Sequence, residues 1–378
     1  MGNVRSQIKI LQKYVYLDNA SSGPLSEPVV ERIAEFARKW QEEGEPWEEG
    51  VFSVLNSKKL FSEMIGARGE EVAAFPGVTY GLGMILTSLP LKRGKAVVAD
   101  HNFPTSILLA RSLEARGLVR EVRVARLDEL GRAVDSDTSL VMVDYVGWLS
   151  GAVADLPSIA EEAHRRGALL VSDAFHAVGV MPINVKNLGV DVLVTGSYKW
   201  LMSLHGAALA YVRDELLDSV TPVFAGWLSV SDSVVKRMER GEPEFARPLD
   251  TSKLELAEGG SKLEPGVQSL ISFAALERSL QFLRENEAPF LYHHTWKLAD
   301  QIAEEVERAG LKLFSSRDNH SAIVSFEHRR PMELVERLQG MGIKVAARPG
   351  LVRVSPHFYN NHEDLYQFVE ALKKALRG

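Results

Sequence analysis

The amine of Lys199 is the side chain in this sequence best placed to act as a nucleophile. It follows the apolar run at residues 191–195, which is long enough for one buried strand and leads into small, hydroxylated residues that permit a turn. A lysine at the end of a buried strand, between the rings of Tyr198 and Trp200, is partly desolvated. Because desolvation lowers the pKa of an ammonium group, Lys199 is a candidate for the neutral amine that forms a Schiff base.

Upstream of this lysine, a carboxylate and an imidazole follow another apolar run. The run at residues 168–172 ends at Asp173, and His176 follows shortly after it. Two successive strands are therefore expected to end in an acid and in a lysine, and ligands bind at such ends in open parallel sheets. An acid, an imidazole and an amine in one place can form a Schiff base and transfer protons.

These residues carry a resemblance to a known family. The family pattern is a strand, Asp-x-x-Gln/His, a second strand, and a short Ser/Thr/Gly turn with an aromatic residue or His before Lys. This chain has Asp173, His176 and Ser197-Tyr198-Lys199 at those places. It resembles the class V aminotransferases, a branch of the fold-type I pyridoxal 5′-phosphate (PLP) enzymes that is related to cysteine desulfurases, isopenicillin N epimerase-like proteins and kynureninases. The resemblance covers about residues 16–361.

The resemblance implies a role for each of these side chains. Lys199 forms a Schiff base with PLP and then shuttles the α-proton of the substrate, acting as a general base and acid. Asp173 pairs with the pyridinium N–H, and His176 interacts with the ring hydroxyl. Ser197 and Tyr198 bond the phosphate or orient the lysine.

Small residues at 76–83 indicate where the cofactor phosphate binds. They follow a strand at 71–75 and lead into a helix, so backbone N–H groups can converge on an anion at the helix N-terminus. The resemblance places the PLP phosphate here, with contacts from Val78 and Thr79. The pattern Gly-x-Gly-x-x-Gly is absent from the sequence, which argues against a dinucleotide-binding dehydrogenase.

The segment Asn102-Phe103-Pro104-Thr105 follows the predicted strand at 95–99. An aromatic residue at a strand end usually belongs to the core, but most family members place a ring here that stacks on the pyridine. The segment resembles the kynureninase version. The resemblance therefore implies that Phe103 stacks on the cofactor ring and that Thr105 reaches its phosphate.

The predicted substrate contacts come from the two ends of the chain. Residues 14–24 resemble the family's N-terminal Tyr-Leu-Asp-Asn-Ala segment, which lines the substrate mouth, and Asn19 is the candidate contact. The family also uses an arginine near the last strand to bind the α-carboxylate bidentately. Arg348 matches the desulfurase and lyase position and Arg353 matches the kynureninase position, so the sequence leaves both open.

A loop-rich stretch at residues 221–266 predicts that a second subunit takes part in the site. Long loops in a compact domain are usually functional or bridge subunits. Segments at 226–227 and 262–267 resemble family elements that reach the phosphate of the neighbouring subunit, so Trp227 and Val267 are candidate cofactor contacts. Val267 stands where threonine is usual, which leaves a backbone N–H for this contact. We therefore expect a homodimer with shared active sites.

Strands and helices alternate through most of the chain, and the length of 378 residues suits two domains of unequal size. The pattern predicts an α/β fold with a seven-stranded, mostly parallel sheet and a smaller α+β C-terminal domain. The resemblance implies that this is the fold of the fold-type I PLP-dependent transferases. The expected division is an N-terminal arm at 1–14, a large PLP-binding domain at 15–265, and a linking helix with the small domain at 266–378.

Composition excludes several classes of protein. The net charge is -6 without a basic block, so nucleic acid is not an expected partner. No apolar run reaches membrane-spanning length and the N-terminus lacks a signal-peptide pattern, so a cytoplasmic protein with no membrane contact is expected. The sequence has 0 cysteines, which excludes thiolate metal sites, and no metal is expected. It also lacks the thiolate that a cysteine desulfurase needs to take up sulfur, which excludes that activity.

The cofactor contacts do not choose the reaction. Transamination, β-elimination, racemisation and kynureninase-type hydrolysis share the same set of residues. Aminotransfer is the family's commonest outcome, so a PLP-dependent aminotransferase acting on a small amino acid is expected. A PLP-dependent lyase or kynureninase-like hydrolase is the alternative. A PLP-binding protein without activity is disfavoured because Lys199 and a candidate carboxylate-binding arginine are both present.

Overall fold

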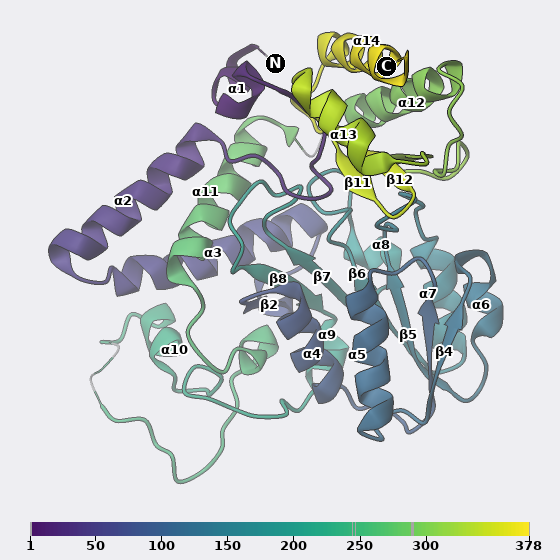
Figure 1. Cartoon of the computed structure of the whole chain (residues 1–378). Helices are drawn as coiled ribbons and strands as arrows, with labels where there is room; N and C mark the ends of the chain where they lie inside the picture. Colours follow the sequence, from purple (N-terminus) through teal and green to yellow (C-terminus); the bar gives the residue numbers. More distant parts are fainter. Residues whose placement is uncertain (1, 244, 246, 289–290, 378) are drawn as a thin grey trace.

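The computed structural model describes residues 2–243, 245, 247–288 and 291–377, and it contains a large domain with a smaller one at its upper edge (Figure 1). Residues 1, 244, 246, 289–290 and 378, which fall in the predicted arm, loop and small domain, lie outside the described residues. Short helices occupy the N-terminus and several connections: α1 (Gly2–Ser6), η1 (Lys9–Gln12), η2 (Gly69–Glu71), η3 (Leu127–Glu129), α6 (Leu130–Ala133), α8 (Val185–Leu188), α9 (Asp214–Leu217), α10 (Val234–Glu239) and η4 (Gly259–Leu263).

The large domain is built on one sheet with the strand order β2-β8-β7-β6-β5-β3-β4. Strand β8 is antiparallel to both of its neighbours, and the other pairs are parallel. The predicted seven-stranded, mostly parallel sheet is therefore confirmed. The strands are β2 (Val72–Phe75), β3 (Lys95–Ala99), β4 (Glu121–Ala125), β5 (Thr138–Asp144), β6 (Leu169–Asp173), β7 (Val192–Gly196) and β8 (Ala208–Val212).

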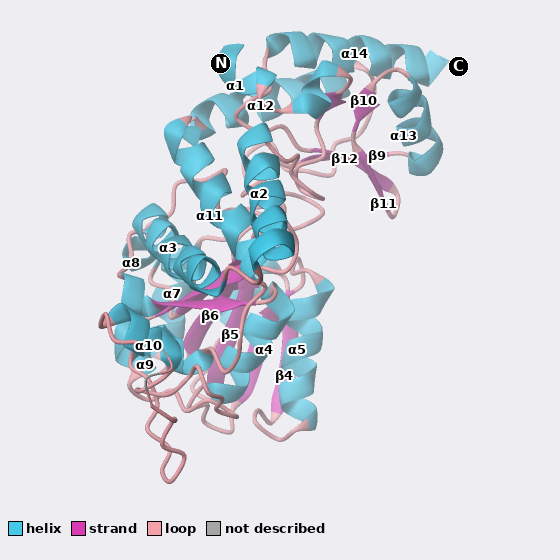
Figure 2. Ribbon diagram, turned by 90° about the vertical axis from the view of Figure 1, so that its left-hand side faces the viewer, coloured by secondary structure: helices cyan, strands magenta, loops and turns pink. Residues whose placement is uncertain are grey.

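Helices cover both faces of this sheet, as expected for a doubly wound fold (Figure 2). On one face, α3 (Trp47–Ile65), α7 (Leu156–Arg165) and α11 (Leu270–Glu285) contribute to the core, and α2 (Glu27–Glu43) packs against α11. The other face packs against α4 (Val78–Ser88) and α5 (Pro104–Ala115). The parallel strands connect through these helices, which brings the carboxyl ends of the strands to one edge.

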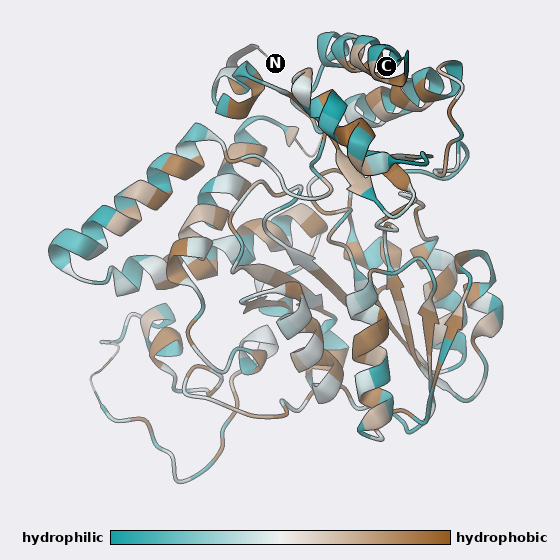
Figure 3. Cartoon of the chain, in the orientation of Figure 1, coloured by the Kyte–Doolittle hydropathy of each residue, from teal (hydrophilic) through white to brown (hydrophobic). Residues whose placement is uncertain are grey.

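Strand β7 shows why its sequence reads as one continuous apolar run. Leu193 packs into the core on the α3 and α11 side, whereas Val192 and Val194 pack on the α4 side. All three side chains are fully buried, and each such burial contributes about 1.5–3 kcal/mol. Strands covered on both faces have no polar face, so they do not alternate in hydropathy. The central strands accordingly appear brown in Figure 3, whereas α2 and α14 (His362–Arg377) carry teal residues.

The small domain contains a three-stranded antiparallel sheet in the order β11-β12-β9, covered by α12, α13 and α14. Strand β1 (Val15–Tyr16) pairs in parallel with β10, so the chain enters through the small domain before it reaches the large sheet. The predicted division assigned residue 15 onward to the large domain, whereas Val15 and Tyr16 pair with a strand of the small domain. The elements are β9 (Val324–Glu327), β10 (Ile343–Lys344), β11 (Ala346–Arg348), β12 (Leu351–Val354), α12 (Tyr292–Arg308) and α13 (Pro331–Gly340).

No helix among the described residues has the length and apolar character needed to cross a membrane. In the same part of the chain, no group of three or more His, Cys, Asp or Glu side chains is arranged to hold a metal ion.

Candidate functional site

The carboxyl ends of the strands surround a cavity of about 290 Å³. Its walls come from the turns after β2, β3 and β7, from the ends of β5 and β6, and from the turn before the antiparallel strand β8. Residues far apart in the sequence meet here because parallel strands end at the same edge of the sheet. Of the predicted site residues, those that line the cavity are Val78, Thr79, Phe103, Thr105, Asp173, His176, Tyr198 and Lys199.

The amine of Lys199 lies at the centre of this cavity wall. Its Nζ is 3.0 Å from Nε2 of His176 and 4.2 Å from the ring centroid of Phe175. Burial lowers the pKa of Lys199 to about 8, and the charge of Asp173 opposes this shift. Burial, together with the charge of Lys199, also holds the pKa of His176 well below its usual range, so the imidazole is neutral. Near neutral pH the Lys199 ammonium group can therefore donate a hydrogen bond to the neutral imidazole.

Asp173 is the acid of the cavity. Its Oδ1 accepts a hydrogen bond of 2.8 Å from the backbone N–H of Phe175. Burial raises the pKa of Asp173 to about 6, and both this hydrogen bond and the charge of Lys199 act in the opposite direction. The carboxylate is thus ionised at neutral pH in surroundings of low dielectric, where a charge interacts strongly with a cationic partner.

Close packing holds Lys199 at this position. A Cβ on Gly23 would collide with the carbonyl oxygen of Lys199, and the Gly23 N–H donates to the Tyr198 carbonyl at 2.8 Å. A Cβ on Gly196 would collide with the ring of Phe175. These two glycines therefore permit the contacts that press the lysine turn against its neighbours.

The residues present fit a bound PLP. No side chain caps the N-terminus of α4 in the described structure, so its first N–H groups are free for a phosphate. Asp173 offers a buried carboxylate to a ring N–H, and Lys199 offers an amine to an aldehyde. The Nδ1 atom of His176 is buried without a partner among the described residues, and a buried polar atom of this kind calls for a partner.

Six of the predicted residues do not line this cavity, and four of them have their contacts elsewhere. Asn19 is fully buried, and its amide donates to the Ser355 carbonyl at 2.9 Å and accepts from the Tyr359 hydroxyl at 2.8 Å. The Ser197 hydroxyl bonds backbone carbonyls of Leu204 and Ala207. Trp227 stacks on Trp47 at 5.9 Å, and Val267 faces a neighbouring groove. Only their strand and loop positions were read from the sequence, which does not show where a side chain points.

Arg348 and Arg353 do not line the cavity either, but they converge on one hydroxyl. Both donate to the Oγ of Ser21, at 2.6 and 2.8 Å. Arg353 is 1% exposed and also donates to the Trp148 carbonyl at 2.8 Å. Burial and the neighbouring charge of Arg348 lower the pKa of Arg353 to about 9. The charge of Asp18 acts on Arg353, and Asp18 accepts a hydrogen bond of 2.6 Å from the same Ser21 hydroxyl.

Sequence reasoning missed several residues of the cavity wall. Asp144 ends an apolar strand in the same way as Asp173, and that signal could have identified it. Phe175 lies inside the Asp-x-x-His motif that was already singled out. His205 stacks on Tyr198 with ring centroids 3.7 Å apart, and only the return of the chain before β8 brings it there.

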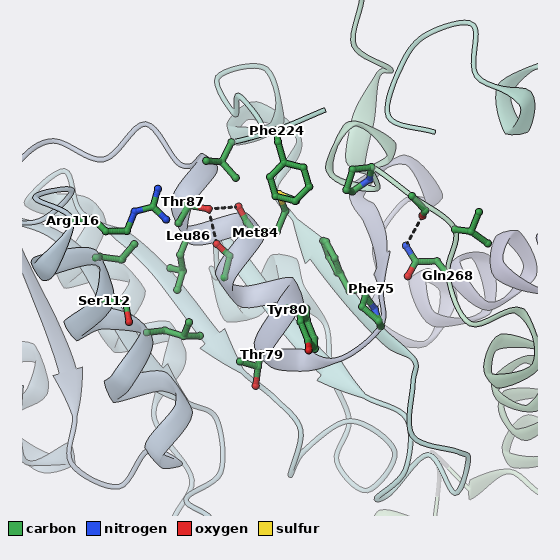
Figure 4. A pocket seen from close by; sticks show the side chains of 18 residues that line it. Phe75, Thr79, Tyr80, Met84, Leu86, Thr87, Ser112, Arg116, Phe224 and Gln268 are labelled. Carbon is green, nitrogen blue, oxygen red and sulfur yellow. Dashed lines mark hydrogen bonds between the residues drawn. The ribbon is translucent and has the colours of Figure 1, made fainter. Parts of the chain in front are cut away.

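A second cavity of about 530 Å³ opens beside the first (Figure 4). The two share Pro76, Thr79 and Tyr80. The second one is a mainly apolar groove between α4 and the segment near Phe224, and Figure 4 shows the rings of Tyr80 and Phe224 around it. Tyr80 is 70% exposed and Phe224 is 58% exposed, which is unusual for two neighbouring rings of a soluble monomer.

The fold and this cavity define a fold-type I PLP enzyme. The family described as Aminotransferase class-V matches residues 15–368, nearly the whole chain. The chain therefore belongs to the class V aminotransferase family, whose members depend on pyridoxal 5′-phosphate. The expected family, fold class and cofactor are confirmed.

The names of similar proteins refer to different reactions. The protein called uncharacterized aminotransferase YcbU of Bacillus subtilis (strain 168) is 27% identical over 97% of this chain and 96% of its own length. Kynureninase of Pseudomonas fluorescens is 26% identical over 90% of this chain and 83% of its own length. The chain is thus similar over nearly its full length to enzymes of one class with more than one activity.

Solved structures share the fold. The apo structure of cysteine desulfurase from Thermococcus onnurineus NA1 has a TM-score of 0.84 and 20% identity, covering 100% of this chain and 98% of that one. A mutant of C-DES with glycine covalently linked to its PLP cofactor also has a TM-score of 0.84, with 18% identity and 98% coverage of both chains. At these identities the likeness concerns the fold alone.

Proposed function

We propose that this chain is a PLP-dependent aminotransferase that acts on a small amino acid. The observation that carries the proposal is the Lys199 amine, whose pKa burial lowers to about 8 and which lies 3.0 Å from neutral His176 in the same cavity as Asp173. An amine in this state can bond the cofactor aldehyde through a Schiff base and later accept or return a proton. The relative whose name specifies an aminotransferase matches the chain from end to end.

The second candidate is a kynureninase-like hydrolase. The Asn102-Phe103-Pro104-Thr105 turn favours it, because Phe103 and Thr105 both line the cavity as the kynureninase pattern implies. Kynureninases are also among the relatives that cover most of the chain. These residues serve the cofactor in both candidates, so the products decide between them.

Each side chain contributes a defined task in the proposed site. Bound PLP supplies an aldehyde that condenses with amines and a ring that accepts electrons from the substrate α-carbon. With PLP bound, Asp173 would hold a proton on the ring nitrogen, and Lys199 would carry the α-proton. The Nε2 atom of His176 contacts Lys199, and its buried Nδ1 would be available to the ring hydroxyl. The N-terminus of α4, at Val78 and Thr79, binds the phosphate.

The neighbouring residues complete the cofactor contacts. Phe103 presents its ring to the cavity, and Thr105 adds a hydroxyl for the phosphate. Tyr198 is braced by His205 and faces the cavity beside the lysine. Ser197 does not contact the cofactor directly. Its hydroxyl donates to backbone carbonyls and thereby orients the turn that carries Lys199.

The two arginines supply the substrate contact. We assign the α-carboxylate to the place now taken by the Ser21 hydroxyl, where Arg348 and Arg353 both donate. A carboxylate has two oxygens and a negative charge, so it is a better acceptor for two guanidinium groups than one hydroxyl. Asn19 holds the segment that carries Ser21 in place through its hydrogen bonds with Ser355 and Tyr359.

The groove beside the cavity supports a homodimer with shared active sites. Its exposed rings lie next to Val267, which is 46% exposed, and it adjoins the cofactor cavity through Tyr80. We infer that a second copy covers the groove and that Trp227 and Val267 face the partner's phosphate site. Burying these side chains removes apolar surface from water, the usual driving force of association.

We expect Phe224→Glu to separate the dimer. Placing a charge in a desolvated interface costs about 3 kcal/mol, which raises the dimer dissociation constant about 100-fold. Sedimentation velocity measures this change. Phe314→Glu is the matched control, because Phe314 is 45% exposed in the small domain and lies outside the groove. A wild-type monomer that still holds PLP tightly would contradict the dimer.

The reaction itself is tested by mixing the PLP-loaded protein with a panel of amino acids. For the proposed function, a small amino acid bleaches the visible cofactor band, releases its keto acid and leaves pyridoxamine 5′-phosphate. A second keto acid then restores the band. Alanine and anthranilate formed from kynurenine would establish the hydrolase instead. Pyruvate and ammonia from a β-substituted alanine would establish a lyase, and both results exclude aminotransfer as the main activity.

A further inference from the structure

Asp144 is a second buried acid beside the first. It ends β5, and in the sheet its Cα pairs in register with that of Asp173 at the end of β6. Residues in register on adjacent strands point to the same face, and both side chains line the cofactor cavity. None of the roles described above uses Asp144.

The carboxyl group of Asp144 is attached to the turn that carries Phe103. Its Oδ2 accepts the Phe103 backbone N–H at 2.6 Å, and its Oδ1 lies 2.8 Å from the Ser106 hydroxyl. The Asn102 side chain adds two bonds to the same strand, donating to the Met142 carbonyl at 3.1 Å and accepting the Asp144 N–H at 2.8 Å. The turn at 102–106 is thus tied to the end of β5 at four points.

This attachment decides where the Phe103 ring stands. The ring is 40% exposed, and it meets Trp148 edge-on with centroids 5.4 Å apart. Side-chain packing therefore constrains it on one side only. Its distance of 5.8 Å from the Lys199 amine depends on the backbone position that Asp144 holds. An anchored backbone is what a ring needs in order to keep one face toward a cofactor.

The charges around Asp144 favour a neutral carboxyl group. Asp173 faces it from β6 and Lys199 from the turn after β7, and Nε2 of His101 bonds its backbone carbonyl at 2.8 Å. Burial and the adjacent Asp173 hold the pKa of Asp144 well above its usual range, although its hydrogen bonds and Lys199 oppose this. Two neighbouring carboxylates in a dry site do not both ionise. The Ser106 hydroxyl donates to Asp144 in the structure. Once protonated, the carboxyl group can donate to that hydroxyl instead, and it still accepts from the Phe103 N–H.

We propose that Asp144 is a positioning residue of the reaction centre, which holds Phe103 over the cavity through a neutral carboxyl group and leaves the negative charge on Asp173. This inference rests on the proposed cofactor site. It predicts that an amide, which has the same shape and no charge, can replace the acid.

The test compares Asp144→Asn with Asp144→Ala in the PLP-loaded protein. Asparagine can accept from Phe103 and donate to Ser106, so the PLP dissociation constant and the visible circular dichroism of the cofactor stay within about twofold of wild type. Alanine removes both hydrogen bonds. We expect it to raise the dissociation constant about tenfold and to reduce the circular dichroism, because the ring facing the cofactor is no longer held.

Two further variants complete the experiment. Ser106→Ala removes one bond from the same carboxyl group, and we expect about a fivefold rise in the PLP dissociation constant even where Asp144→Ala does not fold. Asp100→Ala is the control, because Asp100 is an exposed acid at the start of the same turn and bonds the Leu127 N–H at 3.2 Å. We expect it to match wild type.

The outcomes separate this inference from the proposed function. An Asp144→Asn variant as impaired as Asp144→Ala shows that the charge is needed and overturns the inference. Unchanged binding and circular dichroism in both Asp144→Ala and Ser106→Ala overturn it as well. If the wild-type protein takes up no PLP, both the proposed function and the inference are overturned. If the wild-type protein binds PLP normally, a negative result for the variants overturns only the role proposed for Asp144.

Discussion

Lys199→Ala is expected to lower kcat/KM by at least about 10³-fold and to abolish the visible band of lysine-bound PLP. The variant loses the amine that bonds the cofactor aldehyde, and it loses the group that carries the α-proton. Methylamine added with PLP restores part of the band but leaves the cofactor dissociable. Activity is followed with the amino acid that gives the largest response in the wild-type protein, and the band is followed by absorbance.

Two observations control for other lysines. Borohydride reduction of the wild-type protein attaches the cofactor permanently, and peptide mapping should locate it on Lys199. Lys92→Ala, which removes an exposed lysine of a surface loop, should keep the band and the activity. If the label maps to another lysine, or if Lys199→Ala keeps the band after dialysis, then Lys199 is not the cofactor-binding residue.

Asp173→Asn is expected to reduce kcat/KM by about 10²–10⁴-fold. Removing one partner from a buried charge pair costs about 3–5 kcal/mol, because the remaining charge, here a protonated ring nitrogen, is left unpaired. Asparagine keeps the shape and can still accept the Phe175 N–H, so the fold is retained. In the protein without cofactor, burial raises the pKa of Asp173 to about 6, so uptake of PLP by the wild-type protein should weaken as the pH drops through about 6, where the acid becomes neutral.

The same variant has a readout in the protein without cofactor. Burial lowers the pKa of Lys199 to about 8, and the negative charge of Asp173 limits that shift. Without this charge the ammonium form is less stable, so the pKa of Lys199 falls further in Asp173→Asn. The rate at which the apo-protein forms the visible band with added PLP should then reach half its maximum at a lower pH than in wild type. An unchanged midpoint would show that the two groups do not interact.

The placement of Asp173, His176 and Lys199 followed from local sequence. An apolar run of strand length ends in a polar residue, and parallel strands covered by helices end at one edge. Both rules depend on neighbours along the chain, and the structure brings the three side chains to one cavity. The same rule applied to β5 would have included Asp144, which was left unassigned.

The same rules do not predict the direction in which a side chain points. Asn19 and Ser197 lie beside the site in sequence, but their polar groups turn toward backbone carbonyls and the Tyr359 hydroxyl.

The sequence by itself determined the family, the seven-stranded sheet, the cofactor and the absence of a cysteine nucleophile, because motifs and hydropathy periods are local properties of the chain. Only the tertiary structure showed that Ser21 lies between Arg348 and Arg353 and that Asp144 stands beside Asp173. Those contacts depend on the pairing of β1 with β10, of β11 with β12 and of β5 with β6. Strand partners far apart in sequence are chosen by the packing of the whole core, which no single segment encodes.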